Sequence, residues 1–169
     1  MANKTSFTPE EWAVLREAPH MTAMATAMSG SSGLFGTLAE GVALTQSLVE
    51  GLNSDNELIR SLTARDEAKE SQKVLRSRLQ ELVQGKKFEE AQVGIRDAAL
   101  ARVREAVDLL GRKSPADVES YRSFVQGIGK RVAESAKEGG FLGFGGERVS
   151  AGEKDMLAKL DGALGMHSA

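Results

Sequence analysis

The stretch FTPEEWAVLREAPHMTAMATAM, residues 7–28, decides the fold class, because it predicts a helix at the start of a chain that is rich in helix formers. Thr8 is a typical N-cap, Pro9 stands at the first helical position, and Glu11 three residues after the cap completes a capping box. A hydrophobic staple around this cap is predicted from Phe7 and Trp12. The chain therefore opens with a sharply defined helix.

Pro19 interrupts the hydrogen bonding of this first helix. A proline has no backbone N–H, so the carbonyl of Leu15, four residues earlier, loses its usual donor. We expect a kink or a break at Ala18-Pro19, which also leaves room for a pocket beside the freed carbonyl.

Apolar residues at helical spacing predict further helices along the rest of the chain. The predicted ranges are roughly 34–51, 54–62, 68–84, 88–110, 115–138 and 150–164. Capping boxes are predicted at Ser54 with Glu57 and at Ser150 with Glu153. Ser114-Pro115 repeats the N-cap and proline signal of the first helix.

Together these elements predict an all-α fold, a compact bundle of six or seven helices. Aromatic residues make up only 5% of the chain and β-branched residues are sparse, which favours helix over strand. No linker or change of composition divides the 169 residues. We therefore expect a single domain over residues 1–169, with residues 1–6 and 165–169 frayed.

The composition disfavours several classes of function. The absence of Cys excludes thiol catalysis and thiolate metal sites, and 41% hydrophobic residues are enough to bury a core without disulfides. A formal charge of −2 provides no overall field toward nucleic acid, so a nucleic-acid partner is disfavoured. No stretch approaches the roughly 20 apolar residues that span a bilayer. We expect a cytoplasmic protein that is not an integral membrane protein.

Charged residues crowd the helix predicted from residue 68 onward. Leu75, Leu79 and Leu82 are interleaved there with eight acidic or basic residues, Asp66, Glu67, Lys69, Glu70, Lys73, Arg76, Arg78 and Glu81. This pattern is typical of an amphipathic helix with one solvated face.

The sequence also contains a weak internal echo. Sliding the chain on itself by 109 positions places Phe35 on Phe144. The glycine-rich segments SGSSGLFG (29–36) and GGFLGFGG (139–146) then correspond as loops between equivalent helix pairs. An old duplication and chance composition both explain this echo.

No residue pattern predicts catalysis, a metal site or a cofactor. The two histidines, His20 and His167, lack metal-ligand spacing, and His20 is expected to be a cap or surface residue. No GxSxG or SxxK motif presents a serine nucleophile, and the glycine loops lack the GK[ST] ending of a phosphate loop. We expect no cofactor, and whether the protein is an enzyme stays open, with binding favoured over catalysis.

The segment GGFLGFGG, residues 139–146, must be a loop, because each glycine in a helix is unfavourable by up to about 1 kcal/mol. Three interpretations compete. The apolar side chains plug the base of the bundle, they protrude to contact another protein or a second copy, or they touch a membrane surface transiently. The residues concerned are Phe35, Phe141, Leu142 and Phe144.

Methionines recur at helical spacing in the first helix, at Met21, Met24 and Met28. Such a stripe usually fills a core, but it also suits an adaptable binding groove. Beside the expected kink, Trp12, Met21 and Met24 are therefore candidate lining residues for an apolar pocket.

Four segments resemble a widespread family of small uncharacterised bacterial helical proteins: FTPEEW (7–12), Ala18-Pro19, SGLFG (32–36) and VAESAKEGGFLGFGG (132–146). This resemblance covers both ends of the chain, implies a bacterial origin and an all-helical fold, and supplies no site residues. VAESAKEGG followed by VSAGEKDML (149–157) is similar in layout to the tellurite-resistance TerB-like domains. Glycine and phenylalanine stand where those domains have acidic metal-binding loop residues, so the similarity implies no metal binding.

The sequence thus predicts a non-catalytic module for protein interaction or self-assembly, with a protein partner or a homo-oligomer, that makes contact through the Gly/Phe loops at Phe35 and Phe141–Phe144. The alternative is a binder of a small apolar ligand, or an enzyme, with a pocket between helices near Trp12, Met21 and Met24.

Overall fold

The computed structural model describes residues 2–30, 37–135 and 149–166, and within them the chain forms seven α-helices and no strand. Their bounds are α1 Pro9–Ser29, α2 Thr37–Leu52, α3 Glu57–Leu62, α4 Arg65–Val83, α5 Phe88–Lys113, α6 Val118–Ser135 and α7 Ala151–Leu164. Short 3-10 helices lie at Lys4–Ser6 and Pro115–Asp117. The predicted all-α bundle is confirmed.

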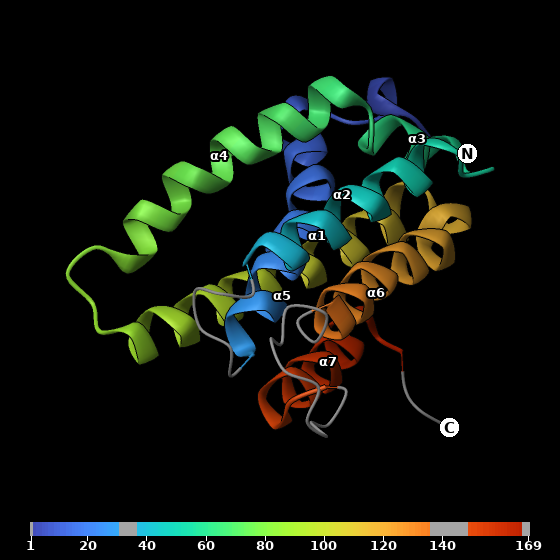
Figure 1. Ribbon diagram of the computed structural model, residues 1–169. Helices are drawn as coiled ribbons and strands as arrows, with labels where there is room; N and C mark the ends of the chain where they lie inside the picture. Colours follow the sequence, from blue (N-terminus) through green and yellow to red (C-terminus); the bar gives the residue numbers. More distant parts are fainter. Residues whose placement is uncertain (1, 31–36, 136–148, 167–169) are drawn as a thin grey trace.

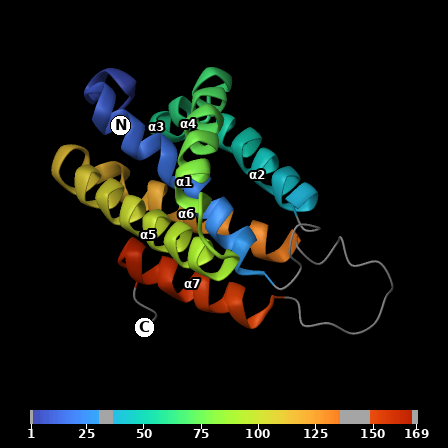
Figure 2. The same cartoon turned by 90° about the vertical axis from the view of Figure 1, so that its left-hand side faces the viewer.

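Helix α1 is the centre of this bundle (Figure 1). It packs most extensively against α5 and α6 and also touches α2, α4 and α7, while α5 and α7 lie side by side (Figure 2). The main core draws its fully buried side chains from these helices, including Leu15, Ile95, Leu110, Tyr121 and Leu160. None of the described helices is long and apolar enough to cross a membrane.

The helix starts predicted at Thr8 and Ser150 are confirmed. The Thr8 hydroxyl accepts a hydrogen bond from the Glu11 amide at 3.2 Å, and the Glu11 carboxylate accepts one from the Thr8 amide at 2.9 Å. Ser150 and Glu153 exchange the same pair of bonds at 3.3 and 2.8 Å. The predicted staple also forms, with the ring centroids of Phe7 and Trp12 6.0 Å apart.

The helix start predicted at Ser54 is wrong. Asn56 is the N-cap of α3, because its side-chain oxygen accepts a hydrogen bond from the Ile59 amide at 3.2 Å. The Ser54 hydroxyl instead accepts from the Asn56 amide at 3.2 Å, and Glu57 is turned toward Asn3, whose amide group donates to it at 2.9 Å.

Of the kink or break expected at Ala18-Pro19, the break does not occur, because helix α1 continues through Pro19. The Leu15 carbonyl, which Pro19 deprives of its helical donor, accepts a hydrogen bond from the Tyr121 hydroxyl at 2.9 Å, inside the core. Burial raises the pKa of Tyr121, so the phenol stays protonated and able to donate. A side chain of α6 therefore occupies the place where a pocket was anticipated.

Fraying was expected for residues 1–6; within the described residues 2–6, backbone and side-chain hydrogen bonds hold the segment against the bundle. The Ala2 amide donates to the buried Asp117 carboxylate at 2.7 Å. Asp117 also accepts from Asn56 at 2.8 Å and from the Ser114 hydroxyl at 2.6 Å. Burial raises the pKa of Asp117, but these hydrogen bonds outweigh it and hold that pKa below its usual range. At the other end, Gly165 adopts a left-handed conformation (φ 69°) that terminates α7.

His20 lies in the core rather than at a cap or on the surface, with 2% of its area exposed. Its Nδ1 is 3.2 Å from the Arg16 carbonyl, and its Nε2 has no hydrogen-bond partner among the residues that the structure describes. Burial lowers the pKa of His20 to about 4.

Replacing Tyr121 with Phe leaves the Leu15 carbonyl buried without a donor, and should lower the free energy of unfolding by about 1–3 kcal/mol. In a Pro19→Ala background the backbone amide of residue 19 returns as a donor, so the same replacement should be less destabilising. Urea unfolding of the four proteins in this double-mutant cycle measures the difference. Equal losses in both backgrounds would contradict the assigned role of Tyr121.

Acid should destabilise the protein through His20. His20 takes up a proton near pH 6.5 in the unfolded chain and only near pH 4 in the folded chain. The contribution of neutral His20 to the free energy of unfolding is therefore fully present above pH 6.5, and about 3 kcal/mol of it is lost as the pH falls from 6.5 to 4. Unfolding free energies measured from pH 7 to pH 4 should show this slope in the natural chain and a flatter profile in His20→Gln. An unchanged profile in the variant would show that another group titrates.

Candidate functional site

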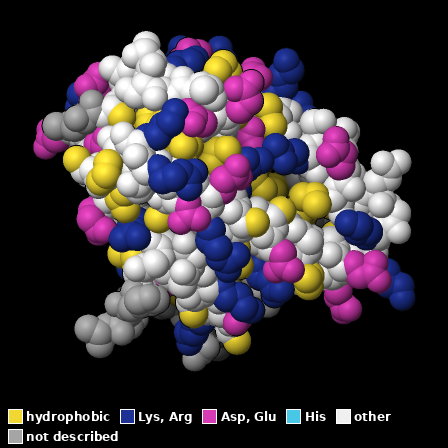
Figure 3. Space-filling model, turned by 180° about the vertical axis from the view of Figure 1, so that it is seen from behind, with side chains coloured by type: hydrophobic (Ala, Val, Ile, Leu, Met, Phe, Trp, Pro, Cys, Tyr) yellow, Lys and Arg dark blue, Asp and Glu magenta, His cyan; other side chains and the backbone are white. Residues whose placement is uncertain are grey.

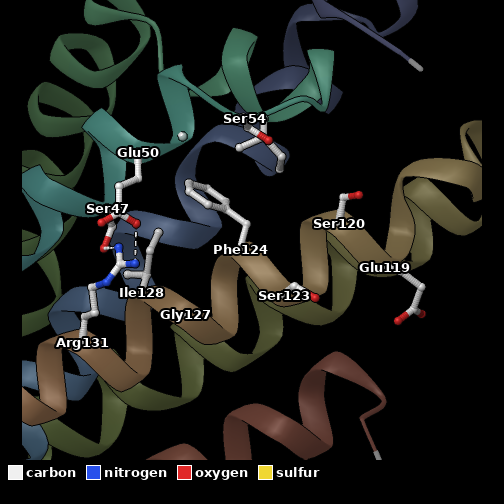
Figure 4. Close-up of a pocket in the computed structure, with 12 residues that line it drawn as sticks. Ser47, Glu50, Ser54, Glu119, Ser120, Ser123, Phe124, Gly127, Ile128 and Arg131 are labelled. Carbon is white, nitrogen blue, oxygen red and sulfur yellow. Dashed lines mark hydrogen bonds and ion pairs between the residues drawn. The ribbon is translucent and has the colours of Figure 1, made fainter.

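An open groove of about 580 Å³ runs between the end of α2, helix α3 and the outer face of α6 (Figure 4). Residues from these three elements and from the turn between α2 and α3 line it: Ser47, Glu50, Gly51, Ser54, Ile59, Glu119, Ser120, Ser123, Phe124, Gly127, Ile128 and Arg131. Two further cavities bounded by described residues both lie along α4, and both are smaller than this groove.

The floor of the groove is apolar. Ile59 and Ile128 are buried, and Phe124 is half-buried where the two hydrophobic clusters of the protein meet. The Phe124 side chain points from α6 toward α2 and α3 (Figure 4), so one part of its ring surface stays open to an occupant. An apolar floor of this kind rewards a ligand that brings a hydrophobic group.

Arg131 closes one end of the groove. Its guanidinium donates to the Ser47 hydroxyl at 3.0 Å and forms an ion pair with Glu50 across to α2 (Figure 4). The side chains of Arg131 and Glu50 are 40% and 61% exposed, and an exposed ion pair of this kind contributes at most about 1 kcal/mol. Arg131 can therefore exchange Glu50 for an incoming carboxylate or carbonyl at little cost.

The other end of the groove presents unused hydroxyl groups. Within the described part of the chain, neither Ser120 nor Ser123 has a hydrogen-bond partner for its side chain. Glu119 beside them is paired with Arg122 at 2.7 Å and is turned away from α2 (Figure 4). No base among the described residues is hydrogen-bonded to either serine, and both hydroxyls are available to hydrogen-bond an occupant of the groove.

Two glycines face the groove for different reasons. A Cβ atom at Gly51 would lie 2.4 Å from Cγ2 of the buried Thr63, so this glycine permits α2 to approach the end of α3. A Cβ atom at Gly127 would meet no atom within 4 Å. The bare backbone of α6 at Gly127 therefore widens the groove and is not required by internal packing.

Two buried carboxylates, Glu17 and Glu67, lie outside the groove and next to α1. Glu17 forms ion pairs with Arg78 of α4 at 3.3 Å and Arg102 of α5 at 3.4 Å. Glu67 forms ion pairs with Arg16 at 3.2 Å and with Lys4. Each carboxylate joins helices that are distant in sequence, which indicates a structural role. Among the described residues no group of His, Cys, Asp or Glu side chains could hold a metal ion.

The structure does not bring the sequence-predicted site residues together. Trp12 and Met21 are 2% exposed members of the main core, and Met24 is half-buried against it. None of the three lines the groove or the two cavities along α4, and the predicted pocket near them stays a prediction. Phe35, Phe141, Leu142 and Phe144 lie outside the described residues, and their predicted contact role stays a prediction.

Sequence reasoning missed the groove itself. A signal was present in α6, where Ser120, Phe124, Gly127 and Arg131 recur every three or four residues beside the buried seam. A helix face made of a hydroxyl, a ring, a glycine and a cation does not belong to a core and is unusual for a fully solvated surface. The partner walls on α2 and α3 could not be assigned to it from the sequence.

No protein-family model, no curated protein and no solved structure matches this chain. The resemblance to small bacterial helical proteins and to TerB-like domains therefore stays a prediction. The function has to be inferred from the geometry of the groove.

Alanine at the two groove glycines should shift stability in opposite directions. Gly127→Ala should raise the free energy of unfolding by up to about 1 kcal/mol, because alanine favours the helix and the space is open. Gly51→Ala should lower it by about 1–3 kcal/mol, because the new methyl group overlaps Thr63. Chemical denaturation measures both changes. A lower free energy of unfolding for Gly127→Ala would mean that other atoms pack against Gly127 in the groove wall.

Proposed function

We propose that this protein is a non-catalytic interaction module and that the groove between α2, α3 and α6 holds a short segment of a partner protein. One observation carries the proposal: an apolar floor at Phe124 stands next to the unpartnered hydroxyls of Ser120 and Ser123 and the bare backbone of Gly127. A hydrophobic anchor flanked by hydrogen-bonding groups is the usual composition of a peptide-binding groove.

The dimensions of the groove support a peptide segment. Its α6 wall extends from Glu119 to Arg131, thirteen residues or about 18 Å along the helix axis. That length accommodates about three turns of a bound helix or five extended residues. The groove is open along this wall (Figure 4), as a continuous chain entering and leaving it requires.

We infer a division of labour among the groove residues. One apolar side chain of the segment packs on Phe124, and its removal from water supplies most of the free energy of binding. Ser120 and Ser123 hydrogen-bond to backbone groups of the segment and fix its position. Arg131 binds a carbonyl or carboxylate at the far end, where its pairing with Glu50 is easily exchanged.

The Gly/Phe loops remain part of this proposal. The segments that contain Phe35 and Phe141 to Phe144 join the ends of the two helices that form the groove walls, preceding α2 and following α6. We propose that their side chains add contact area beyond the groove for the same partner or for a second copy.

A small apolar ligand is the second candidate occupant, because about 580 Å³ falls within the usual range of ligand pockets. Selection of peptides and screening of small fragments on the same groove distinguish the two occupants. An elongated groove and hydroxyls spaced along a helix favour the peptide.

The proposal predicts that peptides selected on this protein depend on the groove. Displayed libraries of helical and extended peptides are panned on the full chain, with counter-selection on Gly127→Trp, whose side chain should fill the groove without entering the core. Gly111→Trp on α5 is the matched control, since a Cβ there also meets no atom within 4 Å. Enriched peptides should share an apolar residue and lose at least about tenfold in affinity for Gly127→Trp and Phe124→Ala.

Three outcomes oppose the proposal or part of it. If the peptides bind Gly127→Trp and Gly111→Trp equally well, their binding surface lies outside the groove. Absence of selected peptides, together with groove-dependent binding of small apolar fragments by NMR, establishes the small-ligand alternative. Loss of helical circular dichroism in Phe141→Ala/Phe144→Ala assigns these rings to the core, whereas weaker peptide binding with intact helices supports the loop contacts.

A further inference from the structure

Exposed apolar side chains gather on one part of the molecule, which we call the α4–α5 hairpin, residues 65–97. Helix α4 leads away from the bundle, turns at residues 84–87 and returns as α5 (Figure 1). Of the five large hydrophobic side chains exposed in the described part of the chain, three belong to it, Val83, Phe88 and Val93, at 39%, 61% and 45% exposure. Their position close together in the chain makes the hairpin the first place to look for an interaction surface.

The outward face of α4 is basic. Lys69, Lys73 and Arg76 follow each other at spacings of four and three residues, so they share one face, and with Gln72 they line a shallow cavity of about 230 Å³. Lys73 lies two residues from the buried Ser71 and Leu75, on the opposite side of the helix. No ion pair satisfies these three cations within the described residues, whereas Arg78 on the inner face is paired with Glu17.

The outward face of α5 is acidic and apolar. Glu90, Val93 and Asp97 follow each other at spacings of three and four residues, and Val93 lies two residues from the buried Ala91 and Ile95. Glu90 has no ion-pair partner in the described part of the molecule, and the 62% exposed Asp97 carboxylate contacts only its neighbour Arg96, at 3.0 Å.

These two faces are complementary when the helices run in opposite directions. On α4 the three residues are spaced four and then three positions apart, and on α5 they are spaced three and then four positions apart. An antiparallel arrangement therefore brings the two sets into register. Lys69 then stands opposite Asp97, Arg76 opposite Glu90, and the aliphatic stem of Lys73 lies over Val93. Both charge pairs are seven residues, or about 10 Å, apart along their helices.

We propose that a second copy of this chain occupies the hairpin, with α4 of each protomer against α5 of its partner about a twofold axis. A twofold arrangement makes both contacts twice and closes the assembly at a dimer. It covers Val93, neutralises Lys69, Arg76 and Glu90, which have no ion-pair partner among the described residues of one copy, and gives Asp97 a second partner besides Arg96. This inference does not rest on the proposed function of the groove.

A polyanion fits the hairpin less well than a second copy. Residues 65–87 contain seven Lys or Arg and four Asp or Glu, but the returning helix α5 starts with Glu89 and Glu90, whose charges would repel an anionic membrane or nucleic acid. Acidic and basic side chains are also interspersed with hydrophobic ones over the face of the molecule in Figure 3. Such a mixed surface suits a partner of mixed charge.

Sedimentation of the full chain over a range of concentrations tests the proposal. The natural protein should form a dimer that weakens with salt. Lys69→Glu/Arg76→Glu and Glu90→Lys/Asp97→Lys should each weaken dimerisation by about tenfold or more, and an equimolar mixture of the two variants, or the four changes in one chain, should restore it. Lys130→Glu/Arg112→Glu, with the same change of charge outside the hairpin, should dimerise normally.

Any result other than this salt-sensitive dimer contradicts the inference. If the protein is a monomer at all concentrations, a second copy is not the occupant of the hairpin. If the natural chain then binds anionic vesicles or single-stranded DNA and Lys69→Glu/Arg76→Glu does not, the occupant is a polyanion. If neither charge-reversal variant changes dimerisation, the dimer uses another surface. A dimer abolished by Gly127→Trp but not by these reversals is formed by the groove, a result that leaves the groove functional while the hairpin assignment fails.

Discussion

The hydrogen bond from Tyr121 to the Leu15 carbonyl is the constraint around which the bundle is organised. Pro19 lies inside the central helix, where a missing amide would leave a buried acceptor unsatisfied at a cost of about 1–3 kcal/mol. Only a side chain from a neighbouring helix can supply the donor, and the phenol does so at 2.9 Å. The proline, usually a helix breaker, thereby fixes where α6 crosses α1, and the core side chains of both helices pack from that point.

Buried carboxylates fix the remaining helices in the same manner. Glu17 and Glu67 join α1 to α4 and α5, and Asp117 joins the N-terminal segment to α3 and to the start of α6. Apolar packing tolerates sliding, whereas a buried charge without its partner is strongly unfavourable. A few polar contacts within an otherwise apolar core thereby position α1, α3, α4, α5 and the N-terminal segment relative to one another.

The sequence predicted what local chemistry controls. The caps at Thr8 and Ser150 and the all-α class depend on neighbouring residues, and they are confirmed. Ser54 was mistaken for a cap because Asn56, two residues later, competes for the same role. Burial of His20, the Tyr121 bond and the groove were not predicted, because each depends on residues far apart in the chain that pattern analysis cannot place opposite one another.

Helix α6 connects the core to the groove. Tyr121, Val125 and Ile128 bury one of its faces, while Ser120, Phe124, Gly127 and Arg131 occupy the adjoining face about a quarter-turn away. The bond that satisfies Leu15 therefore also immobilises the backbone that carries the groove residues. A wall held by the core loses little conformational entropy when it binds a segment, whereas the opposite wall at Glu50 is closed only by an exposed ion pair. The groove thus combines a preorganised side with an adjustable one, and this combination is what the proposed binding of a flexible segment requires.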